Sequence, residues 1–438
     1  MTELLSGWGN YPRAETRLLT ARGRDEARAA VSSEASLIAR GNGRSYGDAA
    51  LSRDAVLSML RSSRMIAFDE ASGTLTCEAG VMLADILDLF VPRGWFPPVT
   101  PGTKFVTIGG MIAADVHGKN HHGAGSFTGH VDSFELALAD GQVVRCSRTE
   151  NAELFAATCG GMGLTGIIVT ASFRLLRIET PYIRQETRQA ANLAEAMDLL
   201  GQSASATYSV AWIDCLSTGA QMGRSVIFSG EHALPHELPA PPPKTGSRTL
   251  TMPFHAPAML LNRWTISAFN QLYYQRNPAG TAIIPYGPYF YPLDAILAWN
   301  RLYGRAGFVQ YQCVLPKAAA AEGMAALLRR IAASGKGSFL AVLKQFGAAN
   351  PHGMLSFPME GFTLALDFAV DQRTLALLGE LDAITGDHGG RVYLAKDACS
   401  RPELLRRGYP RLDEFLAVRH KVDPHHKFSS LLSQRLGL

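Results

Sequence analysis

The sequence predicts a protein of the α+β class with two domains, and three observations support this. Short strand and helix patterns are mixed throughout the 438 residues, without an internal repeat. A chain of this length, of which 47% is hydrophobic, can bury more than one core. The pattern changes near residue 180, where "ETPYIRQETRQ" begins a second region that we expect to extend to about residue 390.

Each clear element of the first region follows from a local pattern. The sequence "GTLTCEAG" at 73–80 is typical of a strand, and "VMLADILDLFVPRG" at 81–94 is typical of a helix that ends at glycine. The run "FELALADGQVVRC" predicts a hairpin that turns at Asp140-Gly141. In the second region, the proline cluster at 233–248 predicts an exposed loop or a partly disordered segment.

Composition excludes several classes of function. The 42 basic and 38 acidic residues give a net charge of +4 without a sustained basic stripe, so we expect no nucleic-acid partner. The six cysteines lack CxxC spacing, which favours reduced thiols, and we expect no metal. The N-terminal residues do not resemble a signal peptide, and no apolar run reaches the roughly 18 residues of a membrane span. We therefore expect a cytoplasmic protein, and leave open a peripheral contact with the inner face of the membrane.

Three glycine-rich segments suggest a large ligand. "ARGNGRSYGD" at 39–48 follows the apolar "SLIA" and is typical of a tight loop that leaves a short strand. Its backbone N–H groups could cradle a phosphate, and a surface turn is the alternative. "GGMGLTG" matches the dinucleotide fingerprint formally, but a helical pattern precedes it and a β-branched strand follows. Because that order is the reverse of the Rossmann order, we interpret it as a turn or a close approach to a flat ligand.

The third segment, at 101–131, contains four histidines. Metal binding would require supporting carboxylates or thiols, which the segment lacks at suitable spacing. Its small residues would instead let a planar ring lie against the backbone, with His117 as a hydrogen-bond donor to the ring or the substrate. We interpret His121, His122 and His130 as ordinary polar loop residues.

These three segments together resemble the FAD-binding half of the vanillyl-alcohol-oxidase superfamily. With "FYPLDAILAWNRLYG", "GFVQYQCVLP" and the C-terminal region from "GGRVYLAK" onward, the chain is more narrowly similar to the decaprenylphosphoryl-β-D-ribose oxidase family. The resemblance covers nearly the whole chain and is weaker at about 180–285. It implies a PCMH-type FAD-binding domain at 1–180, completed by 391–438. It also implies a substrate domain at 181–390, built on an antiparallel sheet with flanking helices.

The resemblance also implies which residues hold FAD. Residues 41–47 would surround the pyrophosphate with backbone N–H donors, and Tyr393 would lie near the flavin. The implied cofactor-binding residues are Gly41, Gly43, Arg44, Ser45, Tyr46, Gly47, Gly102, Thr103, Thr107, Gly109, Gly110, Ala113, His117, Gly118, Gly163, Gly166, Ile167 and Tyr393.

Two departures from relatives carry information. Covalent relatives attach the flavin through a histidine just before the loop serine, where this chain has Arg44, so we expect non-covalent FAD. Some members of the family carry a cysteine in the motif "GFTLALDF", where this chain has Ala365. A thiol-directed inhibitor would therefore find no target there.

Alcohol oxidation by a flavin sets the demands on the remaining residues. A hydride must face the flavin, a group must share the hydroxyl proton, and the reduced flavin needs a positive neighbour. The resemblance places Lys396, which we expect at the end of the strand "RVYLAK", in that role, with His117 and Tyr46 as further catalytic residues. The alternation in "VQYQC" predicts that Gln310 and Gln312 share one strand face. The implied substrate-binding residues are Lys119, Gln310, Gln312, Lys344, Phe346, Thr363, Ala365 and Lys396.

The implied activity is oxidation of the 2′-hydroxyl of a polyprenyl-phosphoryl ribose to a ketone, within arabinose biosynthesis for the cell envelope. A separate NAD(P)H-dependent short-chain reductase would then complete the epimerisation. A sugar, alditol or aldonolactone oxidase of the same superfamily is the alternative, and an inactive flavin-binding scaffold is a third hypothesis. The segment "FHAPAMLLNRWTISAFNQLYY" suits a lipid-facing lid, and a buried helix explains its apolar spacing equally well.

Overall fold

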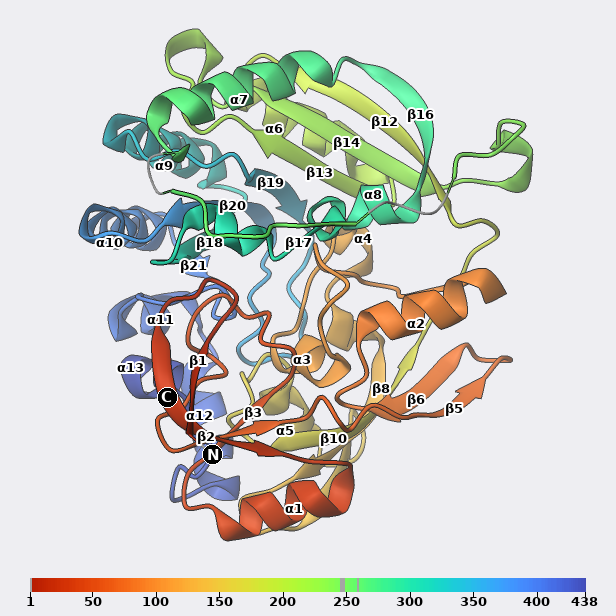
Figure 1. Ribbon diagram of the computed structural model, residues 1–438, viewed down its shortest axis with the longest axis vertical. Coiled ribbons are helices and arrows are strands. Elements are labelled where there is room, and N and C mark those ends of the chain that lie inside the picture. The colour runs from red at the N-terminus through yellow and green to blue at the C-terminus, as the bar shows by residue number, and fades with distance from the viewer. Residues whose placement is uncertain (1, 245–248, 258–259) are drawn as a thin grey trace.

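The computed structural model describes residues 2–244, 249–257 and 260–438, and it confirms the α+β class. Two halves lie one above the other (Figure 1). The lower half contains a four-stranded and a five-stranded sheet, and the upper half contains an eight-stranded antiparallel sheet. Within the predicted proline-rich loop, residues 245–248 lie outside the described residues, and 234–244 are mostly exposed, as predicted.

The lower half begins with a mixed sheet of order β1-β2-β4-β3, in which β3 and β2 run parallel to β4. Its strands are β1 (Thr2–Ser6), β2 (Arg13–Thr20), β3 (Ile38–Arg40) and β4 (Ala55–Ser58). The second sheet is antiparallel, with the order β5-β6-β10-β8-β9. Its strands are β5 (Met65–Asp69), β6 (Thr74–Glu78), β8 (Val131–Ala137), β9 (Val143–Ser147) and β10 (Ile167–Arg174).

Local patterns in this half are confirmed. The strand predicted at 73–80 is β6, and the predicted hairpin is β8-β9, with Gly141 at a φ of 84° in its turn. The predicted helix at 81–94 is α2, followed by a 3-10 turn that ends at Gly94. A helix precedes "GGMGLTG" and a strand follows it, which confirms the order opposite to a Rossmann motif. The helices are α1 (Arg24–Ser33), α2 (Leu83–Phe90), α3 (Ile108–Ala113), α4 (His121–Ala124) and α5 (Ala152–Thr158), and β7 (Trp95–Phe96) pairs with β11 (Leu176–Arg177).

The upper half is built on one sheet of order β16-β12-β14-β13-β19-β20-β18-β21. Its strands are β12 (Tyr182–Ala190), β13 (Tyr208–Ile213), β14 (Ser225–His232), β16 (Gly280–Pro285), β18 (Phe308–Pro316), β19 (Ala341–Phe346), β20 (Gly361–Ala369) and β21 (Arg391–Val392). Three helices pack on one face of it: α6 (Leu193–Gln202), α9 (Ala320–Ser334) and α10 (Gln372–Asp387). The other helices are α7 (Arg263–Arg276) and α8 (Tyr286–Phe290), and β15 (Leu250–Thr251) pairs with β17 (Ile296–Leu297).

Alternation along β18, β19 and β20 separates two kinds of side chain. Val309, Tyr311, Cys313 and Leu315 of β18 join the apolar core beneath α9 and α10. Their neighbours Gln310, Gln312 and Val314 point to the opposite face, as the period of two requires. The same holds in the partner strands, where even-numbered residues of β20 and odd-numbered residues of β19 fill that core. The sheet therefore presents its polar side chains to the lower half.

The C-terminal segment returns to the lower half after β21. Its helices are α11 (Pro402–Gly408), α12 (Leu412–Val422) and α13 (Leu431–Leu436), and α12 packs against α5. Arg435 of α13 pairs with Asp48 and Asp397, at 2.8 and 3.0 Å. Because both carboxylates are buried, this one guanidinium holds α13, the end of the 39–48 segment and the turn after Lys396 together.

Candidate active site

One cavity of about 550 Å³ lies between the loops of the lower half and the polar face of the eight-stranded sheet. Most of the predicted site residues line it. These are Gly41, Gly43, Arg44, Ser45, Tyr46, Gly102, Thr103, Thr107, Gly109, Gly110, Ala113, His117, Gly118, Lys119, Gly163, Gly166, Gln310, Gln312, Lys344, Ala365, Tyr393 and Lys396. The structure thus brings together residues from segments that are more than 350 positions apart in the chain.

Four predicted site residues, Gly47, Ile167, Phe346 and Thr363, do not line the cavity. Ile167 faces a separate core because β10 alternates, and Ile168 lines the cavity in its place. A Cβ at Gly47 would lie 1.8 Å from the carbonyl oxygen of Asp397, so this glycine packs behind the wall. Phe346 supports the His117 ring from behind, with 4.8 Å between ring centroids.

Glycines allow the loops of the lower half to approach one another closely. A Cβ at Gly41 would lie 2.1 Å from Oγ1 of Thr107, so the 39–48 and 101–131 segments can meet only at a glycine. Gly43 has a φ of 62°, and a Cβ there would collide with the guanidinium of Arg40. A Cβ at Gly102 would meet no atom within 4 Å, although this glycine lines the cavity. The predicted strand-to-loop transition at Arg40 is confirmed, and the loops form a cradle that suits an extended cofactor such as FAD.

Three lysines, Lys119, Lys344 and Lys396, face the cavity, and in the part of the chain that the structure describes only Lys396 has a carboxylate, that of Asp367, that acts on its pKa. Lys119 donates to the carbonyl oxygen of Tyr289, and its ammonium lies 4.3 Å from the centre of that ring. Burial, together with the nearby Lys344, lowers the pKa of Lys119 to about 7. Burial also lowers the pKa of Lys344 to about 8. Burial therefore penalises the charged form of these lysines, and the protein itself compensates their charge poorly.

Hydrogen bonds behind the cavity wall fix the orientation of His117. Thr363 donates to the carbonyl oxygen of Cys313 at 2.8 Å, so its hydroxyl accepts from the amide of Gln312 at 3.3 Å. That amide nitrogen also lies 3.0 Å from Nε2 of His117 and can only donate to it. The proton of the neutral ring therefore sits on Nδ1, which has no partner among the described residues. Burial, and next the charge of Lys344, lower the pKa of His117 well below its usual value.

Lys396 lies between an aromatic ring and a buried carboxylate. Its ammonium is 3.7 Å from the centre of the Tyr46 ring. Burial lowers the pKa of Lys396 to about 7, while the charge of Asp367 acts in the opposite direction. Asp367 is fully buried and accepts a hydrogen bond from Gln310 at 2.6 Å. The register of β18 and β20 produces this contact, because it sets Gln310 directly opposite Asp367.

Sequence reasoning missed several of these residues. Asp367 is the acidic residue of the apolar strand "GFTLALDF", and that isolated charge was an available signal. Asp294 accepts from Thr103 and from the backbone of Lys104, both at 2.8 Å, and lines the cavity from the upper half. No local pattern identified it. The aromatic lining residues Trp8, Trp212, Phe228, Tyr273, Tyr289, Phe290 and Trp299 were also missed.

Two predictions are corrected, and one is confirmed. His121 is not an ordinary loop residue: it is 2% exposed in α4, and its ring lies 4.5 Å from that of Phe346. Lys396 is not at a strand end, because β21 stops at Val392 and a turn carries the lysine. All six cysteines are free thiols, as predicted. Within the described residues, no cluster of three or more His, Cys, Asp or Glu side chains is arranged to hold a metal ion.

Comparison with protein-family models identifies two matches. Residues 21–147 match the FAD binding domain, which includes β3, α2, α3 and two of the glycine-rich segments. Residues 361–436 match the family described as D-arabinono-1,4-lactone oxidase, from β20 to α13. The cofactor is therefore FAD, and the chain is an FAD-dependent oxidoreductase with the fold of the vanillyl-alcohol-oxidase superfamily.

Curated proteins extend this result to the whole chain. Decaprenylphosphoryl-β-D-ribose oxidase from Mycolicibacterium smegmatis is 37% identical over 454 residues, covering 100% of this chain and 98% of that protein. A protein from the mprA 5′ region of Streptomyces coelicolor is also 37% identical, over 82% of this chain and 100% of its own length. L-gulonolactone oxidase from Bos taurus is 30% identical over 36% of each chain. With this identity along its entire length, the chain belongs to the decaprenylphosphoryl-β-D-ribose oxidase family.

Proposed function

We propose that this enzyme oxidises the 2′-hydroxyl of a polyprenyl-phosphoryl ribose to the ketone. The full-length similarity to an oxidase of that name supports the substrate class. The observation that carries the proposal is the set of three lysines that face one cavity, Lys119, Lys344 and Lys396; among the described residues, only Lys396 has a carboxylate, that of Asp367, that acts on its pKa. Cations that burial penalises favour an anionic ligand, because a phosphate would supply the missing counter-charge. A neutral lactone or alditol would leave that charge uncompensated.

The chain's own groups suit each requirement of the reaction. FAD, when bound, supplies the acceptor for the hydride that leaves C2′. Lys396, with a pKa of about 7, is partly an uncharged amine at neutral pH and can accept the hydroxyl proton as the ketone forms. Gln310 and Gln312 share the cavity face of β18, where they can bind sugar hydroxyls. The Nδ1–H of His117 remains free to donate to flavin or substrate.

We infer that a separate NAD(P)H-dependent short-chain reductase converts the ketone to the arabinose product. The glycine motif most similar to a nicotinamide fingerprint lies between helix α5 and strand β10, in the order opposite to a Rossmann fold. An epimerisation needs a hydride returned to the other face of C2′, and a second enzyme would supply it.

The test compares substrates in anaerobic flavin bleaching by the purified holoenzyme. Polyprenyl-phosphoryl ribose should bleach the flavin, while ribose, alditols and aldonolactones at equal concentration should not. Removing the phosphate from the lipid-linked ribose should weaken binding more than shortening its tail. If an aldonolactone bleached the flavin rapidly and the phosphoryl ribose did not, the enzyme would instead be an aldonolactone oxidase. The match of residues 361–436 to the D-arabinono-1,4-lactone oxidase family supports that alternative.

A further inference from the structure

We propose that this enzyme docks onto an anionic lipid bilayer through an apolar surface on α7 and the preceding segment. The docking surface consists of Leu260, just before α7, and of Trp264 and Leu272 on α7. The inference rests on the proposed function in one respect, since a polyprenyl substrate is held in a membrane.

The apolar side chains of the docking surface are unusually exposed. Trp264 is 81% exposed, Leu260 53% and Leu272 47%. Trp264 and Leu272 are eight positions apart on α7, so they share one helical face. None of the helices in the described part of the chain combines the length and apolar composition that a bilayer span requires. Large apolar side chains that are exposed together on one helical face mark an interaction site.

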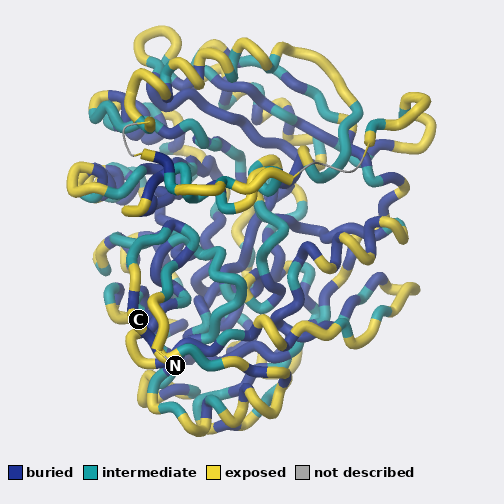
Figure 2. The backbone as a smooth tube through the Cα atoms, viewed as in Figure 1, coloured by how far each residue is buried: buried dark blue, intermediate teal, exposed yellow. Residues whose placement is uncertain are grey.

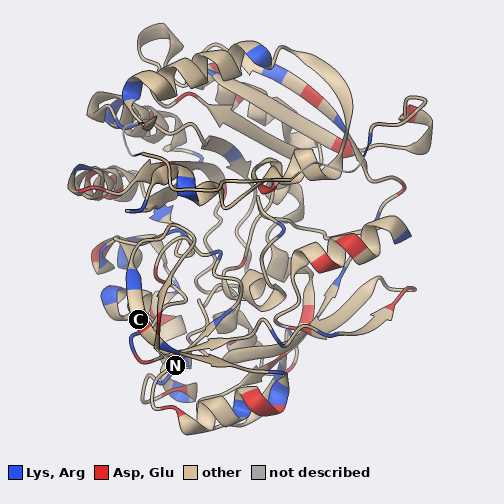
Figure 3. Ribbon diagram, viewed as in Figure 1, with Lys and Arg blue, Asp and Glu red and all other residues tan. Residues whose placement is uncertain are grey.

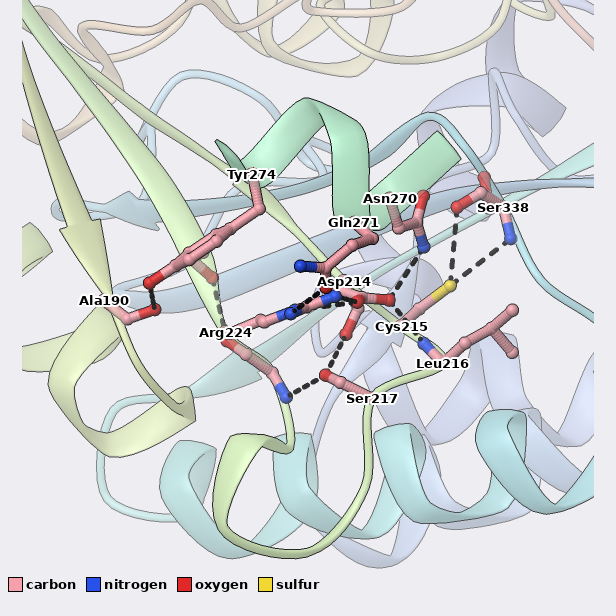
Figure 4. A network of polar contacts seen from close by, with 12 residues as sticks. Ala190, Asp214, Cys215, Leu216, Ser217, Arg224, Asn270, Gln271, Tyr274 and Ser338 are labelled. Atoms are coloured by element: carbon pink, nitrogen blue, oxygen red, sulfur yellow. Dashed lines mark hydrogen bonds and ion pairs between the residues drawn. The ribbon is translucent and has the colours of Figure 1, made fainter. Parts of the chain in front are cut away.

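The opposite face of α7 is fixed to the protein. Asn270, which is fully buried, donates to Asp214 at 2.7 Å, and Arg224 pairs with the same carboxylate at 2.9 Å (Figure 4). Arg224 also donates to Gln271 of α7 at 2.7 Å. Ile266 packs into the core beneath the helix. The exposed face is thus held outward, at the edge of the upper half (Figure 2).

The charge around the docking surface suits an anionic bilayer. From Leu238 to Leu293 the sequence contains four basic residues and no Asp or Glu, although the chain carries 38 acidic residues in 438. Arg263 and Arg276 stand at the two ends of α7, and both are exposed (Figure 3). Basic residues that flank an apolar face draw a helix to anionic phospholipids. A neutral protein partner would not account for the lack of acidic residues.

The docking surface also adjoins the cavity. Tyr273 of α7 and Asn277 just after it line the cavity, and so do Leu293 and Trp299 on either side of β17. A lipid-linked substrate could therefore keep its tail in the bilayer while its sugar enters the cavity.

Vesicle co-sedimentation of the holoenzyme, without substrate, tests the docking surface. We expect binding to phosphatidylcholine vesicles that contain about one third phosphatidylglycerol, weaker binding to phosphatidylcholine alone, and loss of binding at high salt. The double variant Trp264→Glu, Leu272→Glu should lower the partition coefficient at least about tenfold. Ile66→Glu is the matched control, because Ile66 is 54% exposed on β5 in the lower half. This variant should bind vesicles as the wild-type protein does.

Several outcomes would overturn the proposal. The first is that the wild-type protein stays in the supernatant when anionic vesicles are sedimented. The second is that the double variant binds the vesicles as strongly as the control variant does. Sedimentation velocity supplies a third outcome: a dimer that the double variant abolishes would make this surface a contact between copies of the chain. A short-tailed phosphoryl ribose in solution separates this proposal from the proposed function. The double variant should bleach its flavin at the wild-type rate, and failure of wild type in that assay would contradict the function alone.

Discussion

Gln312 donates a hydrogen bond from its side-chain amide to Nε2 of His117, with 3.0 Å between the two nitrogens. The amide is held in this orientation by Thr363, whose own hydroxyl donates to a backbone carbonyl. The predicted substrate-binding residue Thr363 is thus better described as a positioning residue, since it does not line the cavity. We expect it to act on a bound ligand through the tautomer of His117.

The first prediction concerns Thr363→Val, which keeps the side-chain shape and removes the hydroxyl. Without that acceptor the Gln312 amide can turn its oxygen toward His117, which would move the ring proton from Nδ1 to Nε2. We expect normal FAD content and a decrease of flavin reduction by about tenfold or more. Nitrogen NMR of ¹⁵N-labelled histidine reads the tautomer directly. Thr363→Ser keeps the hydroxyl and should keep both the wild-type tautomer and the wild-type rate. If Thr363→Val kept the wild-type tautomer, Thr363 would not orient His117 through Gln312.

The second prediction concerns Lys396→Met, which keeps much of the apolar stem and deletes the charge. One preorganised electrostatic contact typically contributes about 10²–10³ in rate, so flavin reduction should slow by roughly two orders of magnitude. FAD content and melting temperature should stay near wild type, because the lysine lies on a turn and stacks on Tyr46 without an ion pair among the described residues. Rapid mixing at saturating substrate measures the step. A reduction rate within a few-fold of wild type would show that Lys396 is not required for the step, and His117 would become the candidate.

The third prediction is a pH dependence set by Lys396. Burial lowers its pKa to about 7, so the uncharged amine that can accept a proton increases as the pH rises through 7. The rate of flavin reduction should rise over that range. The Asp367 carboxylate raises the pKa of Lys396, so Asp367→Asn should move the rising limb to lower pH. Glu360→Gln is the control, because this carboxylate is exposed and lies just before β20. If Asp367→Asn left the rise of the rate at the same pH as in wild type, Asp367 would not control the pKa of Lys396.

The glycine-rich loops and the β18 alternation could be predicted from the sequence because both signals are local. A positive φ or a close approach of two backbones favours glycine wherever it occurs, and a period of two places Gln310 and Gln312 on one face in any register. Asp367 and Thr363 could not be assigned in this way. Their roles depend on β20 lying between β18 and β19, which pairs Asp367 with Gln310 and Lys344 with Thr363. The burial of His121 likewise follows from a distant residue, Phe346.

The fourth prediction is that acid precipitation releases the flavin. Arg44 occupies the position that carries the attachment histidine in covalent relatives, and its guanidinium lies over the Trp8 ring at 3.8 Å. Among the described residues that line the cavity there is no cysteine, and His117 is the one histidine. Flavin fluorescence should therefore appear in the supernatant, while yellow colour that stays with the precipitated chain would show a covalent bond.

The fifth prediction concerns Arg435→Met, which removes the cation shared by Asp48 and Asp397. Both carboxylates are at most 4% exposed, so the substitution leaves two buried negative charges without their partner. We expect a loss of about 3 kcal/mol in unfolding free energy, the lower end for a broken buried pair, because the arginine itself is 24% exposed. Arg406→Met is the control: its pair with Asp413 is exposed and should contribute about 0–1 kcal/mol.

The origin of that loss can be separated from simple packing. If unpaired carboxylates cause it, adding Asp48→Asn to Arg435→Met should recover part of the stability, since one uncompensated charge is removed. The deficit should also shrink as the pH falls, because burial raises the pKa of Asp48 and eases its protonation in the folded variant. Urea unfolding of the holoenzyme at several pH values measures both effects. A deficit that is independent of pH and unchanged by Asp48→Asn would assign the loss to packing instead of charge.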